Sequence, residues 1–344
     1  MRRLKHLTMV AGRWQRWMAG RAGLGADTTV RLRADRIVPI EQPLILISQI
    51  QRSGGTLLTR LLDHHDECFV HPYDFQWGPG PKGHWPALPA DTPADAWLAE
   101  FRERWLISAV DRAAYWKGQN SAQDRHPFVF SHELRRDVFC RQFAARQPAT
   151  RREVLNYHFT AFFNAWLDYQ SMYRGTKRFV CGFSPRVQMT ADALERFWAD
   201  YPDGYLVSVI RDPSSWLASA LRHKRHYQDV PAALELWAAS ARATLEAHAR
   251  RPDRVCAVLF EDLVGKTELV MRRLCDVTSL TFRGSLLEPT FNGRPVRSNS
   301  QFAPAVGLDP SAIDRSALIS AADAARISDD LRDLYSMART RCRL

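Results

Sequence analysis

The sequence predicts an α/β fold, a three-layer sandwich in which helices cover both faces of a central parallel sheet. Short continuous apolar runs recur along the chain, as expected for strands that are buried on both faces. Segments with the apolar spacing of amphipathic helices lie between these runs, and strands that alternate with helices form parallel sheets. The chain has 344 residues, of which 46% are hydrophobic, so it can bury a large core. Disorder, collagen and a pure coiled coil are excluded.

The first predicted unit is a strand, a glycine turn and a helix. Residues 43–50 (PLILISQI) form an apolar run in which three residues are β-branched. Residues 52–56 (RSGGT) follow this run directly, and their glycines favour a turn. The leucines after the turn share one helical face: Leu57, Leu58, Leu61 and Leu62. Residues 67–71 (ECFVH) then predict a second strand.

Helix and strand signals alternate through the rest of the chain, after an irregular stretch. Residues 78–93 hold five prolines and three glycines, so we expect no regular element there. We expect helices over residues 97–107, 151–173, 190–201, 214–225 and 231–250, and from residue 267 onward. We expect strands over residues 179–183, 205–210 and 255–260. No internal repeat is visible.

The N-terminal segment differs from the rest of the chain in its charge. Residues 1–36 carry nine basic and two acidic side chains, and so supply +7 of the net charge of +11. One apolar helical stripe runs through this segment: Leu4, Leu7, Ala11, Trp14 and Met18. The stripe fits either packing on the body of the protein or contact with a membrane surface through residues 1–22. We therefore separate a basic amphipathic segment, 1–36, from a main domain, 37–344.

Charge, cysteine spacing and hydropathy exclude several classes of protein. The remaining residues carry only +4, whereas a protein that grips duplex nucleic acid needs a broad basic face. The six cysteines form no C-x-x-C pair, which argues for a reduced compartment and against a zinc site. No stretch approaches the roughly 20 apolar residues that cross a bilayer. We expect a cytoplasmic protein, peripheral at the membrane if the stripe binds lipid, with no metal and no nucleic-acid partner.

The first candidate site is the glycine turn after the first strand, because parallel sheets bind ligands at the carboxyl ends of their strands. Glycines let successive N–H groups point inward, and the following helix N-terminus attracts anions. The candidate residues for a bound phosphate are Arg52, Ser53, Gly54, Gly55, Thr56 and Leu57. The Lys of the kinase loop G-x-x-x-x-G-K-[ST] is missing. An ordinary strand-to-helix turn is the alternative.

The second candidate site is residues 210–219 (IRDPSSWLAS). Arg211 closes a predicted strand, and Pro213 suits the first turn of a helix. Ser219 lies two turns along that helix, so Arg211 and Ser219 can converge on one phosphate. The alternative is a surface arginine capped by Asp212. Two such motifs in order, each after a strand, favour a binding site.

Together these segments resemble the sulfotransferases that use 3′-phosphoadenosine 5′-phosphosulfate (PAPS). The R-S-G-x-T loop and the R-D-P-x-x-W-x-x-S element look like the two nucleotide signatures of that family, for the 5′-phosphosulfate and the 3′-phosphate respectively. Further segments are similar to the bacterial members: residues 62–65, 71–75, 259–263 and 292–302. The resemblance spans residues 43–303. It implies a P-loop NTPase-like fold, PAPS as the donor without a metal, and a place for Asn299 and Ser300 in the donor site.

The sequence departs from the family pattern at three positions. The fourth loop position, usually Thr or Ser in the family, is Gly55, which leaves backbone N–H groups and Thr56 to hold the phosphosulfate. The acid that family members often carry as Glu is Asp74, which is one methylene shorter. Relatives often carry a Lys before Pro185, so either Arg186 supplies that charge or the role is absent.

The resemblance implies the transfer of a sulfuryl group to an alcohol, which needs in-line placement, neutralised charge and a base. Arg52, which is always charged, suits the leaving group. Asp74 matches the acid position of the family and is the expected base, provided that burial raises its pKa. His71 is the second candidate, although a core or turn histidine is the simpler interpretation. His132 and Glu133 form a third candidate that equally fits a helix cap region.

Five tryptophans lie in the segment where the acceptor would bind: Trp77, Trp85, Trp97, Trp105 and Trp116. Aromatic platforms suit sugars, although tryptophan at such spacings is more often part of a core. We favour a hydroxyl of a glycan or glycolipid as the acceptor. Two alternatives stay open. A noncatalytic nucleotide- or partner-binding protein is consistent with Gly55 and the shorter acid, and a kinase-like phosphotransferase is disfavoured by the missing Lys.

Overall fold

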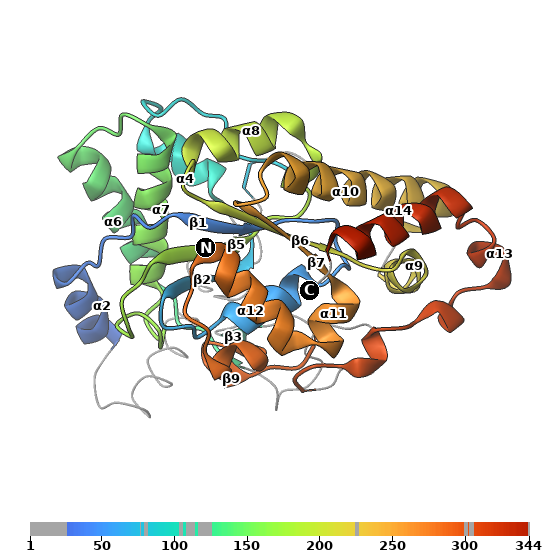
Figure 1. Ribbon diagram of the computed structural model, residues 1–344. Helices are drawn as coiled ribbons and strands as arrows, with labels where there is room; N and C mark the ends of the chain where they lie inside the picture. The colour runs from blue at the N-terminus through green and yellow to red at the C-terminus, as the bar shows by residue number, and fades with distance from the viewer. Residues whose placement is uncertain are drawn as a thin grey trace, which may run out of the picture.

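The centre of the molecule is a parallel sheet of five strands in the order β2-β5-β1-β6-β7 (Figure 1). The computed structural model describes residues 26–75, 77–78, 82–102, 106–107, 114–115, 126–223, 227–298, 302 and 306–342. The sheet strands are β1 (Leu44–Ile47), β2 (Cys68–Asp74), β5 (Phe179–Phe183), β6 (Tyr205–Ile210) and β7 (Val255–Leu259). The chain runs from β1 out to β2, back to β5 and then across β1 to β6, so the direction of winding reverses beside β1.

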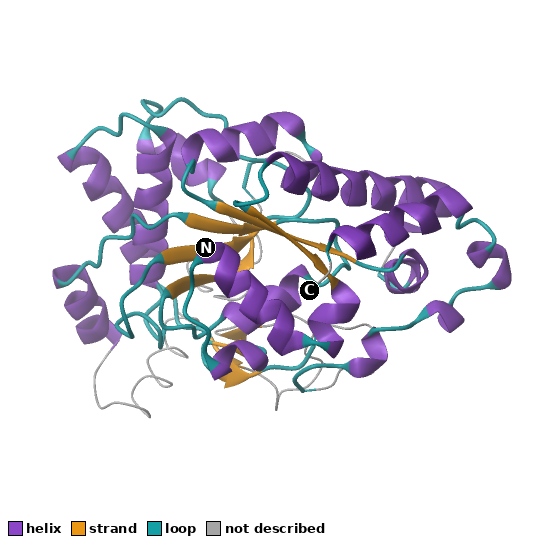
Figure 2. Cartoon of the chain, viewed as in Figure 1, coloured by secondary structure: helices purple, strands orange, loops and turns teal. Residues whose placement is uncertain are grey.

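Helices cover both faces of this sheet, as Figures 1 and 2 show. Alternate side chains of β1 enter two different cores, because successive residues of a strand point to opposite faces. Leu44 and Leu46 join one core, and Ile45 and Ile47 join the other. The first core is closed by α6 (His132–Ala145), α7 (Arg151–Ala165) and α8 (Ala191–Asp200), and the second by α3 (Gly55–Leu62), α11 (Phe260–Gly265) and α12 (Thr267–Thr278). The predicted three-layer sandwich is confirmed.

A third core lies around the ends of β6 and β7. It joins Ile210 and Leu259 to α9 (Pro213–Leu221), α10 (Val230–Arg250) and α14 (Asp329–Arg341). The smaller elements are α2 (Ala26–Asp35), α4 (Ala94–Glu100), α13 (Ala321–Ala324), β3 (Ala114–Tyr115), β4 (His126–Pro127), β8 (Thr290–Phe291), β9 (Arg294–Pro295) and 3₁₀ turns at Val187–Met189, Gly284–Leu287, Pro310–Ala312 and Ser316–Leu318.

Local sequence explains where several helices begin. At α7 the Thr150 hydroxyl accepts from the backbone N–H of Glu153, and the Glu153 carboxylate accepts from the N–H of Thr150, which is a capping box. At α9 the Asp212 carboxylate accepts from the N–H of Ser215, and Pro213 occupies the first turn. Asp212 therefore caps a helix.

Several elements differ from their predicted bounds, and α9 for example ends at Leu221 rather than at residue 225. The predicted strand 67–71 continues to Asp74, and Pro72 is tolerated there because β2 is an edge strand. The predicted helix 151–173 ends at Ala165, since Leu167 donates its N–H to the carbonyl of Val129 and leaves the helical path. The predicted helix 97–107 is confirmed in part: α4 ends at Glu100, and residues 106–107 are again helical.

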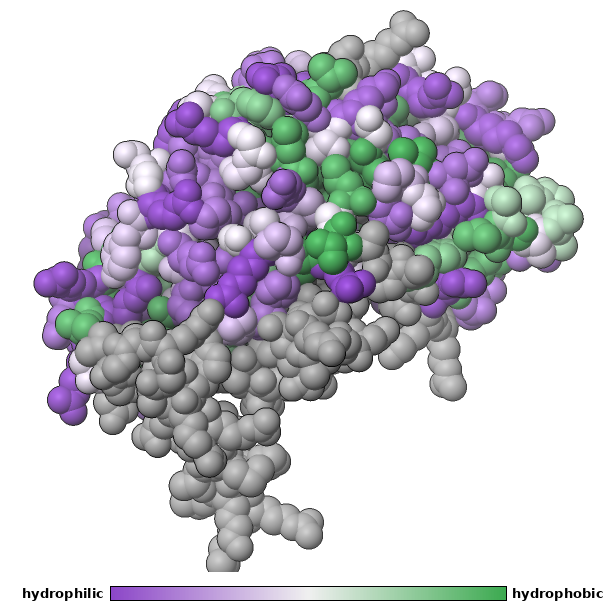
Figure 3. Space-filling model, turned by 90° about the horizontal axis from the view of Figure 1, so that it is seen from below, coloured by the Kyte–Doolittle hydropathy of each residue, from purple (hydrophilic) through white to green (hydrophobic). Residues whose placement is uncertain are grey.

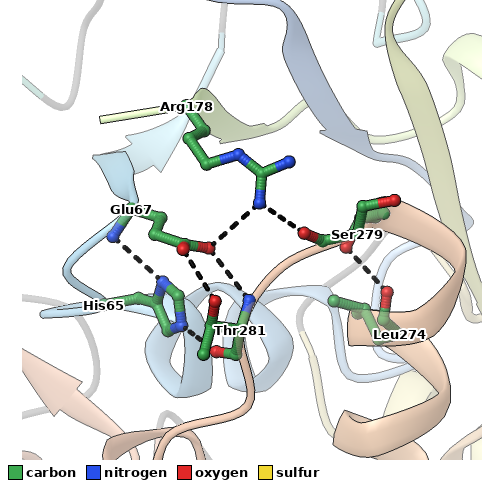
Figure 4. Close-up of polar contacts among 7 residues, drawn as sticks. His65, Glu67, Arg178, Leu274, Ser279 and Thr281 are labelled. Atoms are coloured by element: carbon green, nitrogen blue, oxygen red, sulfur yellow. Dashed lines mark hydrogen bonds and ion pairs between the residues drawn. The ribbon is translucent and has the colours of Figure 1, made fainter. Parts of the chain in front are cut away.

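The loops at the amino ends of β2 and β5 are held by a polar cluster (Figure 4). The Glu67 carboxylate accepts hydrogen bonds from the N–H and the hydroxyl of Thr281, at 2.9 and 2.8 Å. Arg178 lies 3.5 Å from the same carboxylate and donates to the carbonyl of Ser279. His65 contacts the carbonyl of Thr281 at 2.9 Å. Each of these groups has a partner within the cluster, which therefore ties the start of two strands to the end of α12.

The described part of the predicted N-terminal segment is α2, which packs on the body. Its Val30 and Ala34 contact the first core, and Arg33 donates to the Tyr173 hydroxyl at 3.0 Å. The apolar stripe from Leu4 to Met18 lies outside the described residues. On the face seen in Figure 3, hydrophilic residues predominate and hydrophobic residues gather in a few groups. Within the described ranges, no helix combines the length and hydropathy of a membrane span.

Candidate functional site

The predicted site segments meet at the carboxyl edge of the sheet. The glycine loop follows β1, Asp74 ends β2, Arg211 follows β6 and Glu261 follows β7. Because the winding reverses beside β1, this edge opens next to the glycine loop, where ligands of open α/β sheets bind. The topology therefore brings together segments that lie up to about 210 residues apart in the chain.

The glycine loop is built as a tight turn into α3. Gly54 is the N-cap of α3 with φ of 107°, and a side chain there would place its Cβ 2.6 Å from the Phe260 ring. Arg52 also has a positive φ, of 72°. No side chain of the described residues caps α3, so the N–H groups of its first turn remain available to an anion. The Ser53 hydroxyl is buried and has no hydrogen-bond partner among the described residues.

The space beside Gly55 explains why this loop position carries no side chain. A Cβ on Gly55 would lie 1.9 Å from Nε2 of Gln49 and 2.7 Å from the Phe183 ring. Both contacts are closer than real Cβ atoms allow, so even an alanine at this position requires Gln49 or Phe183 to move. The departure at Gly55 is thus matched by a neighbouring glutamine that fills the same space.

The second motif contacts the first directly. Arg52 donates through Nε to the Ser219 hydroxyl at 3.1 Å. Arg211 donates through Nη1 to the carbonyl of Arg52 at 3.2 Å and through Nη2 to the carbonyl of Ala312 at 2.5 Å. Arg211 is only 3% exposed, which excludes the surface arginine of the alternative interpretation. Its Nε has no hydrogen-bond partner in the described chain and remains available for a ligand.

Phe260 and Glu261, in the third similar segment, support both motifs. The Phe260 ring lies 4.1 Å from the Arg211 guanidinium and also limits the space at Gly54. The Glu261 carboxylate accepts from the N–H of Asp212 at 3.0 Å and from the Tyr335 hydroxyl at 2.6 Å. Burial raises the pKa of Glu261, against these hydrogen bonds and the charge of Arg211.

The site has an excess of positive charge. Burial and then the charge of Arg315 lower the pKa of Arg52 to about 10. Burial also lowers the pKa of Arg211 to about 10. The negative charge of Glu261 raises this pKa, while the positive charges of Arg315 and Arg52 lower it. Both guanidiniums still carry their charge at neutral pH. An anion bound among them would relieve this repulsion.

Arg315 is a site residue that the sequence motifs missed. It is 5% exposed, pairs with Asp309 at 3.0 Å and lies 4.0 Å from the Phe302 ring. Arg222 contacts the same ring at 4.4 Å. Arg315 comes from the C-terminal segment, orange to red in Figure 1, which passes α11 and α9 before α14 packs beside α10. No local pattern marks this arginine, because only the path of that segment brings it to the loop.

Arg186 reaches the glycine loop from the end of β5. It donates through Nε to the Gln51 side chain at 2.9 Å and through Nη2 to the Tyr227 hydroxyl at 3.3 Å. Its backbone N–H donates to the carbonyl of Gln49 at 3.1 Å. A positive charge therefore lies beside the residue that precedes Arg52, as expected if Arg186 replaces the Lys of relatives.

The candidate bases lie in different environments. Asp74 is 5% exposed and pairs in register with Phe183 of β5, the strand that lies between β2 and the β1 strand of the glycine loop. His71 is fully buried, its Nδ1 lies 2.9 Å from the carbonyl of Tyr73, and its ring lies 4.3 Å from Phe162. These contacts suit a core histidine. His132 and Glu133 are exposed in the first turn of α6, behind the N-cap Ser131, and so fit the helix cap interpretation.

The other similar segments have a structural place or lie outside the described residues. Asp63 accepts from the Thr290 hydroxyl at 2.7 Å and from the N–H of Gly293 at 3.0 Å, which joins residues 62–65 to residues 292–293. Asn299 and Ser300 lie outside the described residues, as do Trp105 and Trp116. Trp77, Trp85 and Trp97 are core residues, between 0 and 3% exposed, and form no exposed platform for a sugar.

The observations at this edge fit a phosphorylated donor. The buried Ser53 hydroxyl and Arg211 Nε lack partners among the described residues, and the guanidiniums repel one another. Buried polar groups of this kind are normally hydrogen-bonded. The residues that would hold such a donor come from both motifs: Arg52, Ser53, Gly54, Gly55, Thr56, Leu57, Arg211 and Ser219. The described residues contain no group of three His, Cys, Asp or Glu side chains that could hold a metal ion.

A parallel sheet with helices on both faces, and a glycine loop between its central strand and a helix, defines a protein of the P-loop-like α/β class. The model of the sulfotransferase family matches residues 43–284, and the chain belongs to that family. Membership of this family also accounts for the order in which the two motifs and the segments between them occur in the chain.

The chain is similar to three solved structures of sulfotransferases or sulfotransferase domains. The sulfotransferase domain of the Synechococcus PCC 7002 olefin synthase is 18% identical, with a TM-score of 0.48, over 89% of this chain and 97% of that chain. The sulfotransferase domain of the curacin biosynthetic pathway is 17% identical, with a TM-score of 0.45, over 88% and 98%. A sulfotransferase from Alicyclobacillus acidocaldarius is 14% identical, with a TM-score of 0.43, over 88% and 96%. No curated protein matches the chain.

Proposed function

We propose that this sulfotransferase moves a sulfuryl group from PAPS to a hydroxyl of its acceptor, without a metal. The observation that carries the proposal is the contact between the two motifs, in which Arg52 donates to Ser219 and Arg211 donates to the backbone of Arg52. One loop and one arginine cluster then hold the 5′ and 3′ ends of the same donor. Turnover of radiolabelled PAPS over a panel of alcohols, sugars, lipids and phenols, with and without Mg²⁺, tests this function.

In this reaction the acceptor oxygen forms a bond to sulfur while the bond from sulfur to the bridging phosphate oxygen breaks. Adenosine 3′,5′-bisphosphate leaves, and the hydroxyl proton passes to a base. Arg52 stabilises the charge that develops on the bridging oxygen, and the N–H groups at the start of α3 hold the phosphate. Asp74 takes the proton, with His71 as the second candidate. Asp74 is suited to the task by its place at the end of β2, on the same edge as the loop.

The acceptor that we propose is a hydroxyl of a glycan or glycolipid. Trp77, Trp85 and Trp97 are core residues, so this choice rests on the hydroxyl chemistry of the reaction and on the basic N-terminal segment. We place the protein in the cytoplasm, with the basic segment 1–36 ahead of the transferase domain 37–344 and residues 1–22 at the membrane surface.

Adenosine 3′,5′-bisphosphate is expected to bind at least about tenfold more tightly than AMP. The 3′-phosphate gains charged hydrogen bonds from Arg211 and Ser219, which are worth about 1.5–3 kcal/mol each. Titration calorimetry measures both affinities. Ser219→Ala should reduce the difference between the two nucleotides, and equal affinities in the wild type would contradict the assignment of the second motif.

Deletion of residues 1–22 is expected to leave turnover of a soluble acceptor unchanged and to weaken binding to anionic vesicles. The apolar stripe and the surrounding basic residues both favour a membrane surface. Vesicle co-sedimentation and thermal melting of the truncated protein check this. If the truncated protein no longer melts cooperatively, the stripe belongs to the core and the membrane proposal is wrong.

A further inference from the structure

Gln49 is a buried residue beside the glycine loop, and its side chain has no partner among the residues that the structure describes. It follows β1, is 0% exposed, and neither Nε2 nor Oε1 forms a hydrogen bond in the described structure. A buried amide without a partner destabilises a folded protein. An apolar side chain of the same length would avoid this destabilisation. The presence of an amide therefore suggests that it forms a hydrogen bond when a ligand is bound.

The position of the amide shows where such a partner would lie. Nε2 occupies space 1.9 Å from the site of a Cβ on Gly55, which is the first residue of α3. It therefore adjoins the helix N-terminus, where the N–H groups of the first turn attract an anion. The Ser53 hydroxyl, which is also buried and has no partner in the described part of the chain, belongs to the same loop.

The two neighbouring glutamines differ from Gln49, because in each of them at least the side-chain oxygen accepts a hydrogen bond. Gln188 is 3% exposed, accepts from the Ser48 hydroxyl at 2.9 Å and donates to the Ser240 hydroxyl at 3.0 Å. Gln51 accepts from Arg186 and Tyr227 through Oε1, while its Nε2 is also buried without a partner among the described residues. Unpaired donors of Gln49, Gln51 and Ser53 are thus gathered around the glycine loop, and Nε2 of Gln49 lies against Gly55, the first residue of α3.

We propose that Gln49 is a donor-binding residue, whose Nε2 donates a hydrogen bond to the 5′-phosphosulfate end of the donor held at the start of α3. Gly55 is then required because any side chain there displaces the amide. This role rests on the proposed function, and it assigns a contact to a residue that precedes the loop motif.

The test is nucleotide binding by Gln49→Met, with Gln49→Leu as a second apolar replacement. We expect both variants to bind adenosine 3′,5′-bisphosphate at least about tenfold more weakly than the wild type does, because a hydrogen bond to a charged group is lost. Adenosine 3′-monophosphate, which lacks the 5′ group, should bind as tightly as it binds the wild type. The melting temperature without nucleotide should stay equal or rise, because an unpaired buried amide has been removed.

The matched control is Gln188→Met, which removes a buried amide that is fully paired. It should lower the melting temperature and leave both nucleotide affinities unchanged. If either folded Gln49 variant binds adenosine 3′,5′-bisphosphate like the wild type, Gln49 is a packing residue and the inference is wrong. If the wild type binds neither nucleotide, the proposed function itself fails, so the two failures are distinguishable.

Discussion

Arg52→Ala is expected to slow sulfuryl transfer by about 10²–10³-fold with every acceptor. Arg52 is assigned to the bridging oxygen of the donor, and that half of the reaction does not change with the acceptor. Removal of one preorganised donor of this kind typically costs about 2.7–4 kcal/mol of transition-state stabilisation. The measurement is kcat/KM for PAPS over a set of alcohols and phenols.

Two comparisons separate this effect from damage to the fold. Arg52→Lys keeps the charge but loses the planar fork and the Nε bond to Ser219, so its rate should lie between those of wild type and Arg52→Ala. Arg136→Ala removes an exposed arginine that pairs with Asp95, and it should change neither the rate nor the melting temperature appreciably. An Arg52→Ala defect confined to some acceptors would remove Arg52 from the leaving-group role.

Asp74→Asn is expected to slow transfer to an alcohol by about 10²-fold or more, and transfer to a phenol much less. The amide keeps the shape of the carboxylate but cannot take a proton. A phenol loses its proton far more readily than an alcohol, so it depends less on the base. Affinity for adenosine 3′,5′-bisphosphate should stay close to that of the wild type, because Asp74 is assigned to the acceptor side.

Asp168→Asn is the matched control for a buried acid. Asp168 accepts from the N–H of Val129 and from Nε1 of Trp166, at 2.9 and 3.0 Å, and burial raises its pKa to about 6. Its replacement should lower the melting temperature without any dependence of rate on the acceptor. Near-normal turnover of the best alcohol by Asp74→Asn would exclude Asp74 as the base and leave His71 as the candidate. His71→Gln should then slow transfer to alcohols more than transfer to phenols.

The strand-loop-helix unit around residues 43–62 could be predicted because its signals are local. A buried parallel strand produces a continuous apolar run in the sequence, glycines indicate a turn, and leucines at helical spacing indicate a buried helix face. The same holds for Arg211 and Asp212, since a strand end, a capping Asp and a Pro at the first turn follow one another in the chain. The bounds of α7 and β2 were less predictable, because pairing with distant segments decided where they end.

The sequence by itself determined the sandwich, the two loop motifs and their places after β1 and β6. Only the tertiary structure decided which residues surround those motifs. Arg315 lies at the loop because the C-terminal segment crosses it, and Phe260 lies between Gly54 and Arg211 because β7 is the neighbour of β6. Gln49 and Gly55 share one space because the turn folds the end of β1 against the start of α3. Contacts of this kind depend on how close distant segments lie in space. A sequence pattern shows the spacing and polarity of residues along the chain, but not the distances in space between its segments.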